Sequence, residues 1–253
     1  MRIATIYDIH GNLPALEAVL AEIFAEGADR VIVGGDVVAG PLPVETIACL
    51  RTASEKIPMD FILGNAESEL LRHVNGEPIN GLSPRADEEA KWVATQLSAE
   101  DIQFIANWPA TITLELPQIG SVLFCHATPN DDITVFTAKS NAAKLSSLFA
   151  HVSASVVVCG HTHMQFDGIV NNIHVVNSGS VGLPFGQTGA DWLLIGDKVD
   201  FRHTDYDLEK AAERIRAANY LQAESFAANN VLQAPSVEMA MQMLTQLEAS
   251  QEN

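Results

Sequence analysis

Short runs of hydrophobic residues alternate along the chain with longer segments whose apolar side chains recur every three or four positions. Residues 2–7 form the first run, and residues 14–26 follow it with helical spacing up to a stop at Gly27. The same alternation recurs over residues 31–50 and 61–71. Because strands that alternate with amphipathic helices build βαβ units, we expect a parallel sheet with helices outside it.

The segment from about residue 75 to 109 lacks strand-like runs. Ser83 and Ser98 each have the character of a helix N-cap, with acidic side chains in the turn that follows. We therefore predict a helical excursion over this range. Two interpretations stay open: it packs as filler against the main body, or it forms a lid that brings Trp92 or Trp108 to the border of a cleft.

Strand patterns dominate residues 111–203, and they include a hairpin that turns at Asn171-Asn172. These strands imply a second sheet. The tail after Asp207 has helical spacing and many charges, and residues 250–253 are expected to fray.

The length of 253 residues lies at the upper end of what one hydrophobic core supports. The chain has no internal repeat and no low-complexity linker. Residues 1–249 are therefore expected to form a single domain with one site.

The charge balance restricts the partners. Acidic residues number 32 and basic residues 14, which gives a formal net charge of −18. Such a negative surface repels nucleic-acid polymers and anionic membranes. A cleft that holds divalent cations can have the opposite local field, so a small phosphorylated substrate remains compatible with the charge.

Cysteine usage and the N-terminus indicate a cytoplasmic protein. The three cysteines, Cys49, Cys125 and Cys159, are an odd number without C-x-x-C spacing, as is typical of free thiols in a reducing compartment. The N-terminus has no signal-peptide pattern, and no apolar run approaches about 18 residues.

Each of five apolar runs is followed by a residue type that can bind a metal ion. Singly, motifs such as Asp-x-His or Gly-Asp arise by chance, but their ordered occurrence after strands argues against unrelated polar residues. In open α/β sheets, ligands bind beyond the carboxyl ends of the strands, so these side chains are expected to converge on one rim. They are Asp8, His10, Asp36, Asn65, His126, His161 and His163.

The order of these motifs, D-x-H, G-D, G-N, a lone histidine and G-H-x-H, resembles that of the calcineurin-like metallophosphoesterases, most of all the small bacterial and archaeal phosphodiesterase branch. The spacing covers residues 1–180, and VNSGSVGLP at 176–184 is similar to the stretch that closes that fold. The resemblance implies an α/β fold, a four-layer αββα sandwich of two facing mixed sheets, with the helical excursion at about 75–109 added.

The resemblance also implies a dinuclear metal centre. One ion would take Asp8, His10, Asp36 and His163, and the other would take Asn65, His126, His161 and the shared Asp36. Imidazole, carboxylate and amide ligands together suit two divalent transition-metal ions, such as manganese, iron, zinc or nickel, better than magnesium or calcium. Two such ions lower the pKa of water towards 7 and polarise phosphoryl oxygens, so no side-chain nucleophile is needed.

Asp36, Asn65 and His126 are the residues to which we assign the catalytic step, because they would hold the ions that activate the attacking hydroxide. Substrate contacts are predicted for Asn65, Asn12 and His73. Asn12 follows the first motif and could donate to a phosphate oxygen, or it could serve only as the polar start of a helix. His73 lies one or two turns past Asn65 on a predicted helix and could reach the cleft.

One position departs from the family pattern. In GNAE, Ala66 stands where those enzymes carry a histidine, or a cysteine in the bacterial and archaeal branch. Without that partner, Glu67 is expected to bond only backbone or a neighbouring group. The segment GDVVAGP also lacks the arginines of the protein serine/threonine phosphatases, which argues against a phosphoprotein substrate.

We therefore expect a metal-dependent phosphoesterase that hydrolyses a small phosphodiester or nucleotide-like substrate by attack of a metal-bridging hydroxide. A phosphomonoesterase, or phosphatase, that recruits its acid from His73 or water is the second interpretation. A non-catalytic metal-binding interaction scaffold is the third, and Ala66 is its only support.

Overall fold

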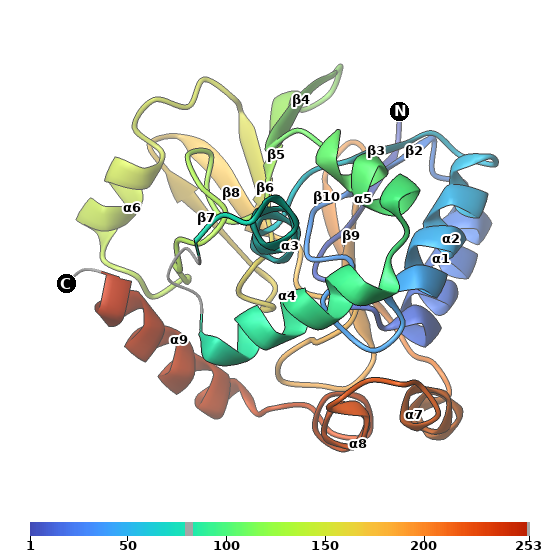
Figure 1. Ribbon diagram of the computed structural model, residues 1–253. Coiled ribbons are helices and arrows are strands. Elements are labelled where there is room, and N and C mark those ends of the chain that lie inside the picture. The colour runs from blue at the N-terminus through green and yellow to red at the C-terminus, as the bar shows by residue number, and fades with distance from the viewer. Residues whose placement is uncertain (79–82, 252–253) are drawn as a thin grey trace.

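The computed structural model describes residues 1–78 and 83–251 (Figure 1), and its strands in these ranges form two five-stranded sheets. The first sheet has the spatial order β10 (Val199–Thr204), β9 (Ala190–Ile195), β1 (Ile3–Ile6), β2 (Arg30–Val33) and β3 (Met59–Phe61). Strands β1, β2 and β3 are parallel, whereas β9 is antiparallel to β1 and β10 is antiparallel to β9. The sheet is therefore mixed.

The second sheet has the spatial order β4 (Thr111–Leu116), β5 (Gly120–Cys125), β6 (Val156–Cys159), β8 (Ile173–Asn177) and β7 (Phe166–Val170). Its three central strands are parallel, and the two edge strands pair antiparallel. This sheet is mixed as well.

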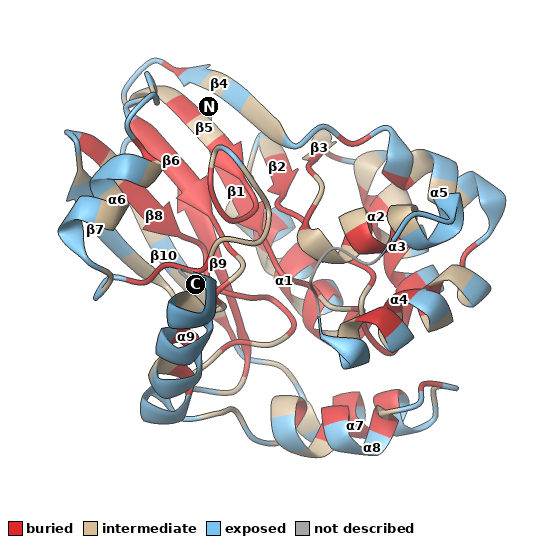
Figure 2. Cartoon of the chain, turned by 60° about the vertical axis from the view of Figure 1, so that its left-hand side comes forward, coloured by how far each residue is buried: buried red, intermediate tan, exposed pale blue. Residues whose placement is uncertain are grey.

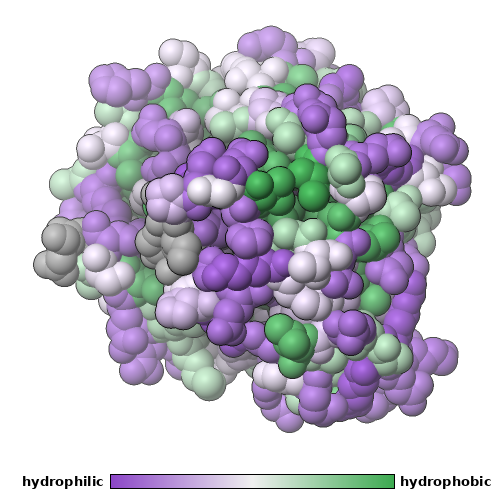
Figure 3. Space-filling model, in the orientation of Figure 1, coloured by the Kyte–Doolittle hydropathy of each residue, from purple (hydrophilic) through white to green (hydrophobic). Residues whose placement is uncertain are grey.

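Helices connect the strands and cover the outer faces of the sheets. In chain order they are α1 (Leu13–Glu26), α2 (Pro43–Ser54), α3 (Asn65–Asn75), α4 (Pro84–Gln96), α5 (Ala99–Ala106), α6 (Ala142–Leu148), α7 (Leu208–Arg216), α8 (Ala223–Phe226), the π-helix η1 (Ala227–Val231) and α9 (Val237–Gln251). Across the described ranges, every helix is too short or too polar to cross a membrane. Figure 3 shows hydrophilic side chains over much of one face, as a net charge of −18 leads one to expect.

The two sheets face each other across a buried core. On β1, Ile3 belongs to this core between the sheets, while Ala4 packs on the opposite side. On β6, Val158 belongs to the same core and Val157 to the outer face. Strands buried on both faces need further layers outside them, and Figure 2 shows the buried strands between more exposed helices. The predicted four-layer αββα sandwich is confirmed.

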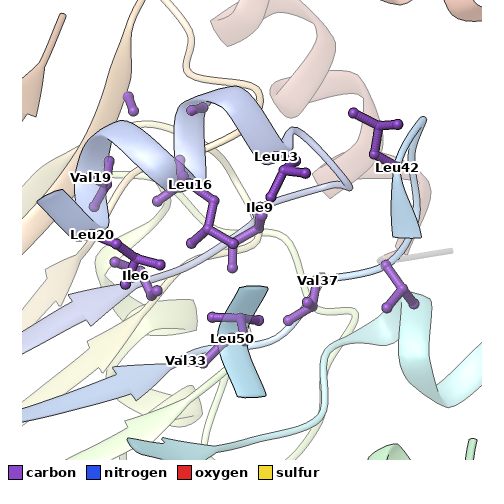
Figure 4. Packing of buried hydrophobic residues seen from close by; sticks show 14 of the residues in the cluster. Ile6, Ile9, Leu13, Leu16, Val19, Leu20, Val33, Val37, Leu42 and Leu50 are labelled. Carbon is purple, nitrogen blue, oxygen red and sulfur yellow. The ribbon is translucent and has the colours of Figure 1, made fainter. Parts of the chain in front are cut away.

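Helix α1 begins and ends as its sequence predicts. The Asn12 side chain accepts a hydrogen bond from the Ala15 N–H at the first turn, and Gly27 ends the helix in the left-handed conformation with φ 66°. Between these ends the helix buries a leucine- and valine-rich stripe on the first sheet, where Leu20 lies beside Ile6 and Leu16 beside Ile9 (Figure 4). Each such side chain contributes roughly 1.5–3 kcal/mol when fully buried.

Most strand predictions agree with the structure. The hairpin between β7 and β8 turns at Asn171-Asn172, and both residues have positive φ, 52° and 65°, as a type I′ turn requires. The apolar run that begins at Phe61 contributes only its first residue to β3, however, because that strand ends at Phe61. The last apolar residues of that run belong to the loop that leads to α3.

The prediction for the last two strands needs a correction. The run of strands after residue 111 predicted that β9 and β10 would belong with the second sheet, but both extend the first one. Leu194 lies opposite Ala4 on β1 and opposite Asp200 on β10. Alternation along a strand fixes which side chains are buried but does not name the strand beside it.

The helical excursion is present as α4 and α5, with Ser83 and Ser98 as N-caps, and the predicted residues 79–82 lie outside the described residues. Trp108 stacks on the Phe61 ring at 5.0 Å between centroids. Both predicted cleft tryptophans therefore take part in packing, since Trp92 packs against a tyrosine of the C-terminal region.

The C-terminal helix extends further than the sequence predicts. Helix α9 includes residues 250 and 251, which we expected to fray, while residues 252 and 253 lie outside the described residues. Gln251 explains the extension, because its side chain donates to the Ile133 carbonyl at 2.6 Å and accepts from the Val135 N–H at 2.8 Å.

Candidate metal centre

Loops after five strands bring the seven predicted side chains together. Asp8 and His10 follow β1, Asp36 follows β2, Asn65 begins α3 after β3, His126 follows β5, and His161 and His163 follow β6. Their ligand atoms form two groups, each within 4.8 Å: Asp8, His10 and His163, and Asp36, His126 and His161. Asn65 adjoins the second group, since its Oδ1 lies 3.1 Å from His126 Nε2.

The backbone at these positions is strained. In the described chain, seven residues other than glycine have positive φ, and two of these form the Asn171-Asn172 turn. The other five all belong to the predicted set: Asp8, His10, Asp36, His161 and His163. A non-glycine residue in this region costs roughly 1–3 kcal/mol and persists where its surroundings fix it, commonly at a functional site.

Asp36 lies between the two groups. Its Oδ2 is 3.7 Å from His10 Nε2, and its Oδ1 is 3.5 Å from His126 Nε2. The Ala66 N–H donates to Oδ1 at 2.8 Å, which holds the carboxylate in this orientation. One side chain therefore offers an oxygen to each group.

Backbone carbonyls orient the imidazole rings. Three histidines place Nδ1 against a carbonyl oxygen: His10 against Ala39 at 3.0 Å, His126 against Gly34 at 2.9 Å, and His163 against Leu183 at 3.1 Å. A donating Nδ1–H leaves Nε2 with the lone pair that a metal requires. His161 is reversed, because its Nε2 rather than its Nδ1 lies near a carbonyl oxygen, that of Ile133, at 3.2 Å.

Asp8 carries a buried oxygen without a hydrogen bond. Its Oδ2 accepts from the His161 N–H at 2.9 Å, while no donor in the described residues bonds Oδ1. That Oδ1 lies 3.4 Å from His163 Nε2, 4.0 Å from His10 Nε2 and 3.9 Å from His126 Nε2. An orphaned carboxylate oxygen that faces several imidazole nitrogens fits a metal ion.

The site is dense in interacting charges. Burial disfavours the imidazolium form of His126, but Asp36 and Asp8 outweigh it and raise its pKa to about 9. Burial and the nearby His126 lower the pKa of His161 to about 4. Burial, followed by Asp36, raises the pKa of the Glu67 carboxyl to about 7. The carboxylates of Asp36 and Asp8 thus favour positive charge among the imidazoles.

Glu67 holds the loop that carries Asp36. One of its oxygens accepts from the N–H of Val37 at 2.8 Å and of Val38 at 3.2 Å, and the other from Asp36 at 2.8 Å and Gly64 at 3.1 Å. The expectation that Glu67 bonds backbone is confirmed. A fully buried carboxylate therefore joins the loop after β2 to the loop after β3.

These two loops touch closely because glycine occupies the contact. Gly35 has φ 90°, and a Cβ at this position would lie 2.5 Å from the Gly64 nitrogen and 2.8 Å from His126 Nδ1. A larger residue would push Asp36 and its neighbours out of place.

A cavity of about 140 Å³ opens beside Asp36 and Asn65, between α3 and α4. Ala66 forms part of its wall, where a longer side chain would project into the space. Within the described residues, Trp92 and Trp108 line neither this cavity nor the larger one near His126.

Asn12 is occupied by structural contacts. Its Oδ1 caps α1 through the Ala15 N–H at 3.3 Å, and its Nδ2 donates to the Gly182 carbonyl at 3.0 Å and the Tyr206 hydroxyl at 3.3 Å. The side chain is completely buried. The structure supports the helix-start interpretation of Asn12 and gives no exposed atom for a phosphate.

His73 is exposed near the end of α3 and lines neither cavity in the described chain. Its neighbour Arg72 instead lines the second cavity, of about 320 Å³, together with His126. The structure therefore does not bring His73 to the candidate site.

Two carboxylates in the first cavity were missed from the sequence. Glu69 and Glu89 both line it. The sequence could have predicted that Glu69 lies beside Asn65, because it follows Asn65 by four residues and so lies on the same helix face. Glu89 comes from α4, and no local pattern places that helix over α3.

A family model and a related sequence match most of the chain. The sequence model of the calcineurin-like phosphoesterase superfamily domain matches residues 1–197. The uncharacterized protein MJ0912 of Methanocaldococcus jannaschii is 26% identical over 234 residues, which is 84% of this chain and 91% of that protein.

Two solved structures have a similar fold. The hypothetical protein PH1004 from Pyrococcus horikoshii has a TM-score of 0.76 at 16% identity, over 89% of this chain and 97% of that one. A metallophosphoesterase from Sphaerobacter thermophilus has a TM-score of 0.70 at 24% identity, over 91% of this chain and 99% of that one.

Replacing Glu67 by glutamine should destabilise the protein by about 2–4 kcal/mol, because the amide nitrogen would face N–H donors that lose their acceptor. Urea denaturation at pH 8 measures this change. Glu88→Gln, on the exposed side of α4, is the matched control and should leave the unfolding midpoint unchanged. Equal midpoints for Glu67→Gln and wild type would show that this carboxylate does not hold the two loops.

Proposed function

The chain belongs to the calcineurin-like phosphoesterase superfamily and is a metal-dependent phosphoric ester hydrolase; on that premise we propose that it uses a dinuclear centre to cleave a small phosphoester. The position of Asp36 carries this proposal, since each of its oxygens faces one of the two ligand groups. A carboxylate in that position is suited to bridge two cations.

We assign one ion to Asp8, His10, Asp36 and His163, and the other to Asp36, Asn65, His126 and His161. The unbonded Asp8 oxygen and the oriented imidazoles support these assignments. The mixed nitrogen and oxygen donors suit manganese, iron, zinc or nickel.

Two divalent ions bound there would supply an ionised water as nucleophile at neutral pH and would polarise the phosphoryl oxygens. The side chains of the protein hold and orient that centre. Glu67 fixes the Asp36 loop, and the Ala66 N–H fixes the Asp36 carboxylate. Lys and Arg are absent from the described lining of the cavity at Ala66, so the bound cations would balance the phosphate charge.

The substrate would be a small diester or an activated ester. The methyl side chain of Ala66 cannot act as a general acid for the departing oxygen. His73 is exposed on α3 and does not line the cavity. The interpretation as a phosphomonoesterase that uses His73 as its acid therefore has no support from the geometry.

A substrate screen tests the proposed function. The protein is stripped of metal, reconstituted with manganese, iron, zinc or nickel, and assayed with aryl phosphodiesters, aryl phosphomonoesters and nucleotides. We expect metal-dependent turnover that is fastest with aryl diesters. A stable, metal-loaded protein without turnover on any of these esters would favour the scaffold interpretation.

Asp36→Asn should remove activity and bound metal together, because an amide offers one oxygen where two are required. We expect a loss of at least roughly 100-fold in both, more than the 10- to 100-fold typical of groups that only hydrogen-bond a ligand. Metal content and turnover are measured in parallel with Asp205→Asn, which changes an exposed carboxylate. Two ions per chain and normal turnover in Asp36→Asn would refute the bridging role.

Replacing His161 and replacing His163 should lower the occupancy of different ions, because their ligand atoms lie in different groups. His161→Ala should reduce occupancy of the ion shared with His126, and His163→Ala that of the ion shared with His10. Anomalous scattering from crystals of the two manganese-loaded variants measures each occupancy. An equal loss at both positions in each variant would contradict the assignment.

Ala66→His should help only substrates with poor leaving groups. A positioned general acid is worth roughly 10²- to 10⁴-fold when the departing oxygen needs a proton, and little when it leaves as an anion. Wild type should show a steep dependence of rate on leaving-group pKa, and the variant should show a flatter one. The pH–rate profile of the variant should also gain a new limb at about pH 6 to 7, where the introduced histidine titrates. Rates across an aryl and alkyl ester series at equal metal content measure both slopes. A shallow wild-type slope that the substitution leaves unchanged would mean that another group already donates the proton.

A further inference from the structure

The cavity between α3 and α4 has a definite size and composition. Its volume is about 140 Å³, close to that of a cavity that holds benzene, so it admits roughly six non-hydrogen atoms. Asp36 and Asn65 form the end beside the ligand groups, and Leu70 and Val93 are among the apolar walls. Figure 1 shows α4 running past α3, and the cavity lies between them.

Glu69 on α3 is a buried carboxylate with an unused oxygen. The residue is 2% exposed, and its Oε2 forms an ion pair with Arg72 Nη1 at 3.4 Å. Among the described residues, no donor bonds Oε1. Arg72 offsets part of the cost of burying this carboxylate, and the second oxygen remains available to a further positive group or donor.

Glu89 on α4 is the second carboxylate that lines the cavity, and it is held in place. The Tyr220 hydroxyl donates to its Oε1, and the Tyr220 ring packs edge-on against Trp92 with centroids 5.0 Å apart. Its Oε2 has no hydrogen bond from the residues that the structure describes. Two elements of the fold therefore direct carboxylates into one small space.

We propose that this cavity binds a substrate ammonium group between Glu69 and Glu89, so that the substrate is a phosphodiester in which a small amino alcohol is one of the two esterified alcohols. The proposal rests on the proposed function, because the phosphate must lie at the adjacent ligand groups. An ammonium has three donors and a positive charge, which match the unused carboxylate oxygens. The volume excludes a nucleoside from this cavity, and the apolar walls favour a short alkyl linker.

Phosphonates test the proposal without any bond cleavage. Aminoalkylphosphonates of two to four carbons are compared, on the metal-loaded protein, with alkylphosphonates that carry a methyl group in place of the ammonium. Calorimetry measures each dissociation constant. For the best chain length, wild type should bind the amine roughly 10- to 100-fold more tightly than its methyl analogue.

Three variants locate the effect. Glu69→Gln and Glu89→Gln should each reduce the preference for the amine towards one, while the affinity for alkylphosphonates stays near that of wild type. Glu88→Gln lies next to Glu89 but is exposed, and it should keep the wild-type preference. Circular dichroism confirms that each variant is folded. Because Glu69 and Glu89 lie on different helices, one variant still tests the proposal if the other does not fold.

Equal binding of amine and methyl analogues by wild type would overturn the proposal, as would equal or tighter binding of a hydroxyalkylphosphonate. Failure of every aminoalkylphosphonate to bind would overturn it too. These outcomes are separate from failure of the proposed function. Hydrolysis of aryl esters without any amine preference removes only the amino-alcohol assignment, whereas amine-selective binding without hydrolysis of any ester removes only the catalytic assignment.

Discussion

The buried carboxylate of Glu67 is the contact on which the geometry of the site depends. It accepts four backbone N–H groups from the loops after β2 and β3, and so fixes the position of Asp36 between the two ligand groups. The Ala66 N–H then orients the Asp36 carboxylate. Because the site has this backbone support, its strained residues can keep conformations that an isolated loop would abandon.

Much of the fold and the set of candidate ligands could be predicted from the sequence, because both depend on local patterns. Apolar runs that end in Asp, Asn or His place those residues at strand ends, and parallel strands bring strand ends together. The partners of β9 and the position of α4 over α3 depend on contacts between distant segments, which periodicity does not encode. Glu69 shows the intermediate case: its spacing from Asn65 predicts the shared helix face, while the cavity beside it becomes visible only once Glu89 is placed.

Ala66 and the two cavity carboxylates have a common consequence. An alanine at that position keeps open a space that a histidine side chain would enter, and Glu69 and Glu89 give the space a negative lining. Ala66 therefore belongs to the wall of this small cavity. The absence of an acid at Ala66 favours a substrate whose leaving oxygen needs little assistance, and the proposed ammonium site would select the other part of that substrate.

The claim that Asp36 joins two cations is tested most directly by anomalous scattering from crystals of the wild-type protein loaded with manganese. The account predicts two peaks, one on each side of the Asp36 carboxylate, the first beside His10 and His163 and the second beside Asn65 and His126. A single peak, or two peaks of which one has no contact with Asp36, would contradict it.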